Sequence, residues 1–353
     1  MPLQEQVISI AEKRHIALAL AQRLKLMSGL NIAEKRLPQD GRLDITIHDT
    51  KLDIRLSTMP TQFGESIVMR LLNKSAKILT LDNIGMPPET LQTFRRLIRI
   101  PYGMILVTGP TGSGKTTTLY GALTEINDVT KNIVTIEDPI EYTVERANQV
   151  QIKTQIDLSF ARVLRAVLRQ DPNVILVGEI RDQETATIAL RAALTGHLVF
   201  ATLHTNDAAS TAIRLIDIGV ESYLVAATVR AIIAQRLARR ICSSCSTAYQ
   251  PNEQEISFFT ALFGDVFKQS TFNYGRGCAH CNFTGFKGRI GVFELLELDA
   301  TMRESLRRKD AHNFSQTVAN NRKTPDLLSS AFEMAQQKIT TLGEVMRLAG
   351  EQV

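Results

Sequence analysis

The chain has 353 residues, of which 44% are hydrophobic and 22% are charged, and its net charge is +5. This composition excludes global disorder, and the length predicts two or three domains. No apolar run approaches the ~18 residues that a membrane-spanning helix needs, and the N-terminus lacks the pattern of a signal peptide. We therefore expect a cytoplasmic protein that meets a membrane only through partners.

The first 73 residues predict a small α+β unit. Val7–Leu30 has the apolar spacing of an amphipathic helix, and Asp40-Gly41 is a two-residue hairpin turn signal. Alternating apolar and polar residues predict strands at 43–47, 52–56 and 66–72, with a second hairpin turn around 48–51. A linker with a helix from Pro88 to Ile98 is expected to follow.

From Gly103 onward, strand and helix patterns alternate. Strands are expected at Met104–Val107, Asn132–Ile136, Val174–Val177 and Leu198–Leu203. Helices are expected at Thr116–Ile126, Phe160–Arg169, Asp182–Leu194, Ala208–Ile218 and Ser222–Arg239, the last ending in Arg236, Arg239 and Arg240. This alternation predicts an α/β fold with a mostly parallel sheet, covered by helices on both faces. Ligands of such sheets bind at the carboxyl ends of the strands.

The segment after the first of these strands fits the phosphate-binding pattern G-x-x-x-x-G-K-[ST]. Its candidate nucleotide-binding residues are Gly109, Pro110, Thr111, Gly112, Ser113, Gly114, Lys115, Thr116 and Thr117. The glycines let backbone N–H groups turn toward phosphate oxygens, and the following helix adds partial positive charge. Lys115 is expected to reach the β- and γ-phosphates of ATP, and Thr116 to hold Mg²⁺.

Two acids and a histidine follow other expected strands. Glu137 is a candidate to hold the water that attacks the γ-phosphate. Glu179 is a candidate to assist Mg²⁺ through water or to orient the attacking water, so the general base remains open between the two. His204 is a candidate to sense the γ-phosphate or to stabilise developing charge.

The four cysteines form two Cys-x-x-Cys pairs, Cys242 with Cys245 and Cys278 with Cys281. Two such chelating pairs predict a tetrahedral structural Zn²⁺ site. Buried free thiols and redox-active pairs remain alternatives.

Together, these motifs resemble the secretion ATPase superfamily, specifically the ATPases of type II secretion and type IV pilus assembly. The core motifs occur in the family's order: the phosphate loop, Ile133–Glu141, Val177–Asp182 and Thr195–Asp207. The segments Arg36–Arg42 (RLPQDGR) and Gly64–Leu72 (GESIVMRLL) match the family's domain before the core.

The resemblance implies a homo-hexameric ATPase with a RecA-like P-loop NTPase core. In the family, arginines of the preceding domain reach a neighbouring subunit's nucleotide, and Arg55 and Arg70 match those positions. The cysteines match the zinc module of the assembly and secretion branch, which disfavours pilus retraction. The implied partner is an inner-membrane platform protein, which places the chain at the cytoplasmic face of that membrane.

Family members usually begin with a platform-docking domain and the first half of the domain before the core. The chain begins after both, so the resemblance implies an N-terminally short form. The expected parts are a partial PAS-like α+β domain (1–73), a linker (74–101), the ATPase core (102–240), the zinc module (241–297) and a helical C-terminal region (298–353).

Two other functions are compatible with the phosphate loop. A DNA-translocating or helicase-like motor would bind nucleic acid in a strongly salt-dependent way, but the basic helix end lacks interleaved aromatic residues, so nucleic acid is not an expected partner. A nucleotide-binding scaffold would bind ATP without turnover.

Overall fold

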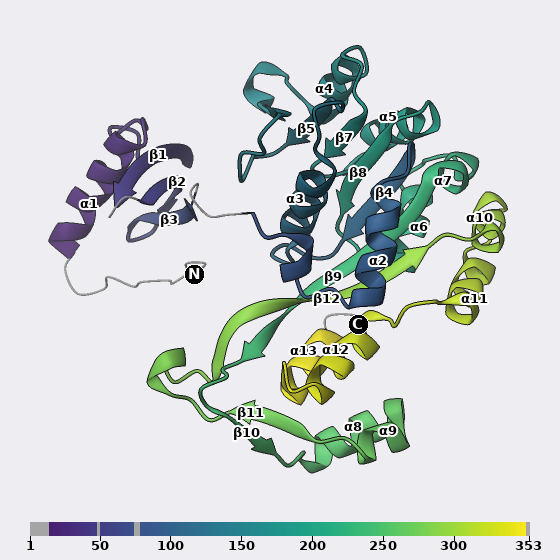
Figure 1. The fold of residues 1–353 in the computed structure, drawn as a ribbon. Coiled ribbons are helices and arrows are strands. Elements are labelled where there is room, and N and C mark those ends of the chain that lie inside the picture. Colours follow the sequence, from purple (N-terminus) through teal and green to yellow (C-terminus); the bar gives the residue numbers. More distant parts are fainter. Residues whose placement is uncertain (1–13, 48–49, 74–77, 351–353) are drawn as a thin grey trace. The chain divides into compact units, whose positions relative to one another are not determined.

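The computed structural model describes residues 14–47, 50–73 and 78–350. It divides the chain into two compact units (Figure 1). The first comprises Met1–Lys77 and Glu141–Thr143, and the second comprises Ile78–Ile140 and Val144–Val353. The finer division into five parts stays a prediction.

The first unit is a helix packed on an antiparallel sheet. Its elements are α1 (Arg14–Met27), β1 (Gln39–Ile47), β2 (Thr50–Thr61) and β3 (Gly64–Asn73), with strand order β1-β2-β3. A small core of Leu43, Leu52 and Ile54 lies on one face of the sheet. The expected helix start at Val7 and the turn at residues 48 and 49 lie outside the described residues.

The hairpin predicted at Asp40-Gly41 is wrong, because both residues lie inside β1 and pair with Ser57 and Leu56 of β2. A Cβ added to Gly41 would lie 2.7 Å from the carbonyl oxygen of Ser28. The glycine therefore serves the close approach of the chain after α1, and not a turn.

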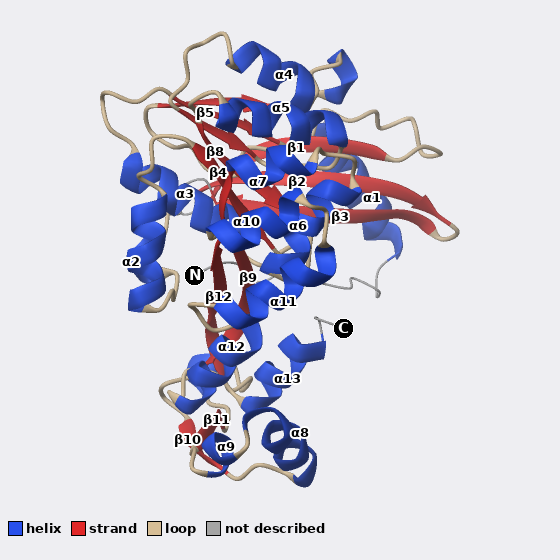
Figure 2. Cartoon of the chain, turned by 90° about the vertical axis from the view of Figure 1, so that its right-hand side faces the viewer, coloured by secondary structure: helices blue, strands red, loops and turns tan. Residues whose placement is uncertain are grey.

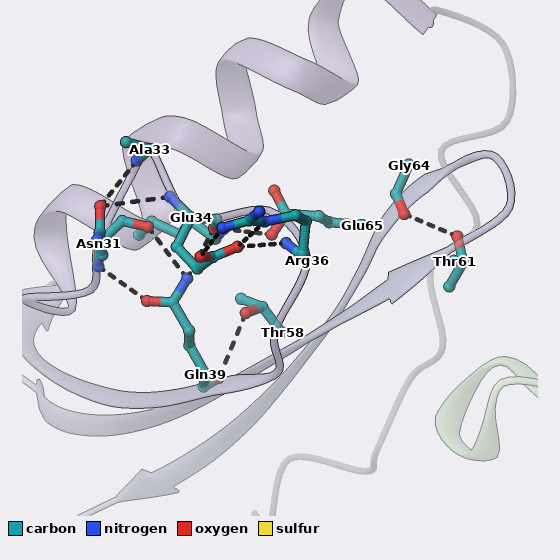
Figure 3. Close-up of polar contacts among 10 residues, drawn as sticks. Asn31, Ala33, Glu34, Arg36, Gln39, Thr58, Thr61, Gly64 and Glu65 are labelled. Atoms are coloured by element: carbon teal, nitrogen blue, oxygen red, sulfur yellow. Dashed lines mark hydrogen bonds and ion pairs between the residues drawn. The ribbon is translucent and has the colours of Figure 1, made fainter.

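The loop between α1 and β1 is ordered by side-chain hydrogen bonds (Figure 3). Asn31 Oδ1 accepts from the backbone N–H of Ala33 at 2.9 Å, and Gln39 Nε2 donates to the carbonyl oxygens of Asn31 and Glu34 at 3.1 and 3.0 Å. Hydrogen bonds from the Arg36 side chain and backbone lower the pKa of Glu34 to about 2. The segment that matches the family's RLPQDGR pattern therefore spans the end of this ordered connection and the first four residues of β1.

The described part of the second unit is built on a seven-stranded sheet with the order β12-β9-β4-β8-β7-β5-β6. The strands are β4 (Gly103–Thr108), β5 (Ile133–Glu137), β6 (Ala147–Gln151), β7 (Val174–Val177), β8 (Leu198–Leu203), β9 (Val229–Ile241) and β12 (Phe286–Glu297). All pair in parallel except β12, which runs antiparallel to β9. Strands β4, β7 and β8 are buried along their whole length, as a sheet covered on both faces requires.

Helices cover both faces of this sheet (Figure 1). They are α2 (Pro88–Leu97), α3 (Lys115–Ile126), α4 (Phe160–Val167), α5 (Gln183–Leu194), α6 (Ala208–Asp217) and α7 (Ser222–Thr228). The predicted core elements are confirmed within one or two residues, with two exceptions.

The helix predicted at Ser222–Arg239 is wrong beyond Thr228, where β9 begins. Strand β9 is hydrogen-bonded on both sides, to β4 and to β12, and this pairing overrides the helical spacing of its apolar residues. Arg236, Arg239 and Arg240 therefore lie in a strand and do not cap a helix. The second exception is β6, an edge strand of sequence ANQVQ with no apolar run to reveal it.

Beyond the core, β9 and β12 extend toward a small module (Figure 2). Its elements are β10 (Ser246–Tyr249), α8 (Glu253–Phe263), α9 (Asp265–Lys268) and β11 (Phe272–Gly275). The helical C-terminal region follows, with α10 (Ala300–Arg307), α11 (Ala311–Asn321), α12 (Leu327–Gln336) and α13 (Leu342–Gly350). Phe332 of α12 packs against the module's phenylalanines, so the two regions share a core. None of the described helices is long and apolar enough to cross a bilayer.

Candidate nucleotide site

The glycine loop lies between the end of β4 and the start of α3. Gly109, Gly112 and Gly114 have φ values of 146°, 80° and 89°, in the region that favours glycine. Lys115 Nζ donates to the carbonyl oxygens of Gly109 and Pro110 at 2.7 and 3.0 Å. The Lys115 ammonium therefore lies against the backbone of the loop, where phosphate oxygens bind in such loops.

Glu179 and His204 lie together at the ends of neighbouring strands β7 and β8. His204 Nε2 is 3.6 Å from Glu179 Oε2, and Arg181 Nη2 is 2.5 Å from Glu179 Oε1. Burial lowers the pKa of His204, the charge of Lys115 lowers it further, and Glu179 partly offsets both effects. The charges of Lys115 and Glu179 therefore both act on His204, near the carboxyl ends of the strands.

Glu137, by contrast, is enclosed by hydrogen-bond donors. It is 3% exposed at the end of β5. Thr135 Oγ1 and Gln149 Nε2 donate to its Oε1 at 2.6 and 3.2 Å, and the Tyr120 hydroxyl donates to its Oε2. Sequence reasoning missed these three donors. Only Thr135 left a signal, because residues two apart in a strand share a face.

The loop after β8 is tied to the end of β4 by hydroxyl groups. Thr108 Oγ1 lies 2.6 Å from Thr205 Oγ1, which lies 2.5 Å from Thr211 Oγ1 on α6. Asp207 caps α6 by accepting from the backbone N–H of Ser210 at 2.7 Å. These contacts fix the loop that carries His204.

The candidate arginines belong to the first unit. Arg42, Arg55 and Arg70 are directly opposite one another on β1, β2 and β3, so three cations form one row. Burial and the neighbouring charge of Arg42 lower the pKa of Arg55. The carboxylates of Asp53 and Glu141 act in the opposite direction, so the row also has acidic neighbours.

The four cysteines converge in the module beyond β9. Their sulfur atoms all lie within 4.8 Å of one another. The Cys242–Cys278, Cys245–Cys281 and Cys278–Cys281 sulfur distances are 3.9, 3.9 and 3.7 Å. A tetrahedral site with zinc–sulfur bonds of about 2.3 Å separates its sulfurs by about 3.8 Å. The cluster is therefore compatible with a structural zinc ion.

A glycine loop between a buried parallel strand and a helix, with a carboxylate and a histidine at neighbouring strand ends, defines a P-loop NTPase core. The chain belongs to the family described as Type II/IV secretion system protein, whose model matches residues 3–347. This confirms the family predicted from the motifs.

Known proteins resemble the chain along most of its length. The type II secretion system ATPase E of Vibrio cholerae is 45% identical over 343 residues, covering 97% of this chain and 67% of that protein. The type II secretion system protein E of Pseudomonas aeruginosa is 44% identical over 343 residues, covering 96% and 67%.

Solved structures share the fold. The pilus retraction motor PilT with bound ADP has a TM-score of 0.64 and 28% identity, covering 93% of this chain and 79% of that one. The ATPase DotB of Legionella pneumophila has a TM-score of 0.66 at 22% identity, covering 89% and 78%. The predicted fold class, an ATPase core with a mostly parallel sheet, is thereby confirmed.

Proposed function

We propose that the chain is an ATP-hydrolysing motor that drives assembly of type II secretion pseudopili or type IV pili. The observation that carries this proposal is the convergence of Lys115, Glu179 and His204 beside the phosphate loop, in a chain of the secretion family. The names of its relatives support secretion over the DNA-translocating alternative.

ATP would lie with its phosphates in the loop Gly109–Thr117. Lys115 would exchange the carbonyl oxygens of Gly109 and Pro110 for phosphate oxygens, which are stronger partners because they are charged. Thr116 and Glu179 offer the oxygen atoms that Mg²⁺ prefers. Bound Mg²⁺ would neutralise charge on the phosphates, and the chain's own groups would position the attacking water.

Glu179 is the stronger candidate for the general base. Its Oε2 faces His204 at the strand end, near the charge of Lys115. Both oxygens of Glu137 already accept hydrogen bonds from the surrounding Tyr120, Thr135 and Gln149. We assign Glu137 a structural role, in which its hydrogen bonds hold the end of β5 in place beside the nucleotide site. We assign Glu179 the role of the general base, which accepts the proton of the attacking water.

Gln substitutions separate these roles. Glu179→Gln should lower kcat by on the order of a hundredfold or more while ATP binding persists, because the amide cannot accept the proton. Glu137→Gln should lower kcat less than about tenfold, because the amide oxygen still accepts hydrogen bonds. ATP turnover and binding of a fluorescent ATP analogue are the measurements, with Lys115→Ala as the inactive control.

A larger loss in Glu137→Gln than in Glu179→Gln would reverse the assignment. ATP binding by the unaltered chain without any turnover, at any protein concentration, would favour the scaffold function instead.

We further propose the assembly in which the motor works. The chain forms a homo-hexamer in which Arg55 and Arg70 reach the γ-phosphate bound by a neighbouring subunit. Its partner is a platform protein of the inner membrane, at whose cytoplasmic face the hexamer lies. The four cysteines hold one structural Zn²⁺, as their sulfur spacing supports.

A further inference from the structure

Strand β9 continues past the point where the phosphate loop begins. Thr108, the last residue of β4, pairs with Ala234 of β9. On the side of β9 that faces β4, the next two residues, Gln235 and Arg236, therefore run beside the loop, while on the other side they pair with β12. Both are only 2% exposed. Such burial of two polar side chains next to a nucleotide loop requires an explanation, because polar groups cost free energy to bury.

Gln235 accounts for the position of the loop itself. Its Oε1 accepts from Thr118 Oγ1, in the first turn of α3, at 2.7 Å. A Cβ added to Gly109 would lie 2.4 Å from the carbonyl oxygen of Gln235, and one added to Gly114 would lie 2.8 Å from its Nε2. The loop thus packs directly on β9, and Gly109 and Gly114 are needed for this contact as well as for binding phosphate.

Arg236 reaches in two directions from the same place. Its Nη1 donates to the carbonyl oxygen of Gln235 at 3.1 Å, and its Nη2 donates to the carbonyl oxygen of Asn206 at 2.9 Å. The first acceptor is the oxygen on which Gly109 rests. The second lies two residues after His204, in the loop between β8 and α6. The hydrogen bonds of one guanidinium group therefore connect the part of β9 that supports the phosphate loop to the loop that carries His204.

The planar fork of arginine suits this task in a way that lysine does not. A guanidinium presents several N–H donors in a fixed geometry, whereas an ammonium is a single point charge on a flexible stem. A buried arginine also costs desolvation, which an apolar residue of similar volume would avoid. The contacts between Thr108, Thr205 and Thr211 hold the same loop independently, so Arg236 is not its sole support.

We propose that Arg236 is a positioning residue for ATP hydrolysis, which fixes the spacing between the phosphate loop and His204. The two groups that face the γ-phosphate, Lys115 and His204, are then held at the distance that hydrolysis needs. This inference rests on the proposed ATPase function. It assigns Arg236 no contact with ATP.

The first test compares Arg236→Lys with Arg230→Lys. Arg236→Lys should lower kcat by on the order of tenfold, the effect of losing one charge-assisted hydrogen bond, and should leave the KM for ATP within about threefold. Arg230 lies at the opposite end of β9, stacked on Tyr102, and its lysine variant should keep normal turnover. Unchanged kcat in Arg236→Lys would overturn the proposal.

The second test asks whether Arg236 acts through His204. A double-mutant cycle with His204→Ala isolates the coupling between the two residues. Arg236→Lys should lower kcat much less in the His204→Ala background than in the unaltered chain. Additive losses would overturn the proposal, because Arg236 would then act on the phosphate loop alone.

Folding is monitored by circular dichroism, with Arg236→Gln as a second variant that retains a buried donor. If both variants lose cooperative unfolding or ATP binding, Arg236 is a structural residue and the proposal fails. If the unaltered chain itself binds ATP without turnover, the proposed ATPase function fails first, and with it the inference about Arg236. These outcomes are distinguishable because the first leaves normal turnover in the unaltered chain.

Discussion

His204 illustrates how much one residue depends on its surroundings at the strand ends. The Glu179 carboxylate and the Lys115 ammonium both act on its ring, which is partly desolvated. Burial and the neighbouring cation both disfavour the imidazolium, while the carboxylate favours it. The net direction is a lowered pKa, so the ring is mainly neutral at neutral pH, with one nitrogen that donates a hydrogen bond and one that accepts.

We expect His204 to titrate below its ordinary value of 6.5 in the nucleotide-free protein. Lys115→Ala should raise the titration midpoint, because it removes a cation that opposes protonation, while burial still holds the midpoint down. An NMR pH titration of the imidazole C–H signals measures both midpoints, with His204→Ala identifying the signal. A midpoint that falls, or stays unchanged, in Lys115→Ala would show that the two groups do not interact.

The sign of the associated stability change follows from the same shift. Because the unfolded chain binds a proton at higher pH than the folded one, His204 opposes folding as the pH falls below 6.5. The ring is partly exposed, so this effect is screened by solvent.

The sequence could reveal this histidine but not the partners of Glu137. His204 follows an apolar strand directly, and parallel strands bring their carboxyl ends to one edge. Tyr120 and Gln149 come from a helix and from an edge strand without an apolar run, so no local pattern links them to Glu137. Arg236 was hidden for a related reason, because the segment around it has helical spacing.

At the scale of elements, the module that carries the four cysteines has little secondary structure of its own around them. Cys278 directly precedes a single turn of 3-10 helix that ends with Cys281, and Cys242 and Cys245 follow the end of β9. The backbone N–H of Cys278 donates to Cys281 Sγ at 3.2 Å, a contact that favours a thiolate. A bound metal would therefore supply much of the order in this segment.

We expect one zinc ion per chain, measured by metal analysis of the purified protein. Cys278→Ser should lower the metal content and the melting temperature, and a chelator should lower the melting temperature of the unaltered chain more than that of the variant. Ser243→Ala, within the first Cys-x-x-Cys pair, serves as the matched control and should keep its zinc. A full-length chain that is metal-free and melts normally would contradict the zinc assignment.

Helices and strands could be predicted from the sequence where the expected burial and the spacing of the apolar residues pointed to the same element. Strands β7 and β8 were placed to the residue, because each is a short apolar run followed by a polar motif. Strand β9 was not, because its apolar residues fit a helix as well as a strand. Its pairing with β4 and β12 makes this segment a strand, and pairing with residues far away in the sequence cannot be recognised from a short stretch of sequence.

At the scale of the whole molecule, the row formed by Arg42, Arg55 and Arg70 bears on how several copies of the chain assemble. Three arginines lie opposite one another on β1, β2 and β3, and two of them, Arg55 and Arg70, are those proposed to reach a neighbouring subunit's nucleotide. In the proposed ring, each nucleotide site would lie between two subunits, so that a residue of one chain would complete the site of the next. Turnover would then be a property of the assembly and not of the single chain.

Turnover per chain should therefore rise with protein concentration. Arg55→Ala and Lys115→Ala should each be inactive alone, yet an equal mixture should regain about a quarter of normal turnover. In a randomly mixed ring, about that share of sites pairs an intact loop with an intact arginine. Steady-state ATP turnover of single variants and mixtures is the measurement. No recovery in mixtures that form rings by light scattering would place the arginines at their own chain's site or outside the reaction.

The course of β9 has a mechanical consequence. Gln235 supports the phosphate loop, and the strand continues to Ile241, directly before Cys242 of the cysteine cluster. Seven residues of extended chain span about 23 Å, and β12 stiffens them by pairing along this stretch. A stiff β ribbon does not bend as a loop does. A change in the tilt of β9 at Gln235 would therefore displace the cysteine cluster at the far end of this ribbon.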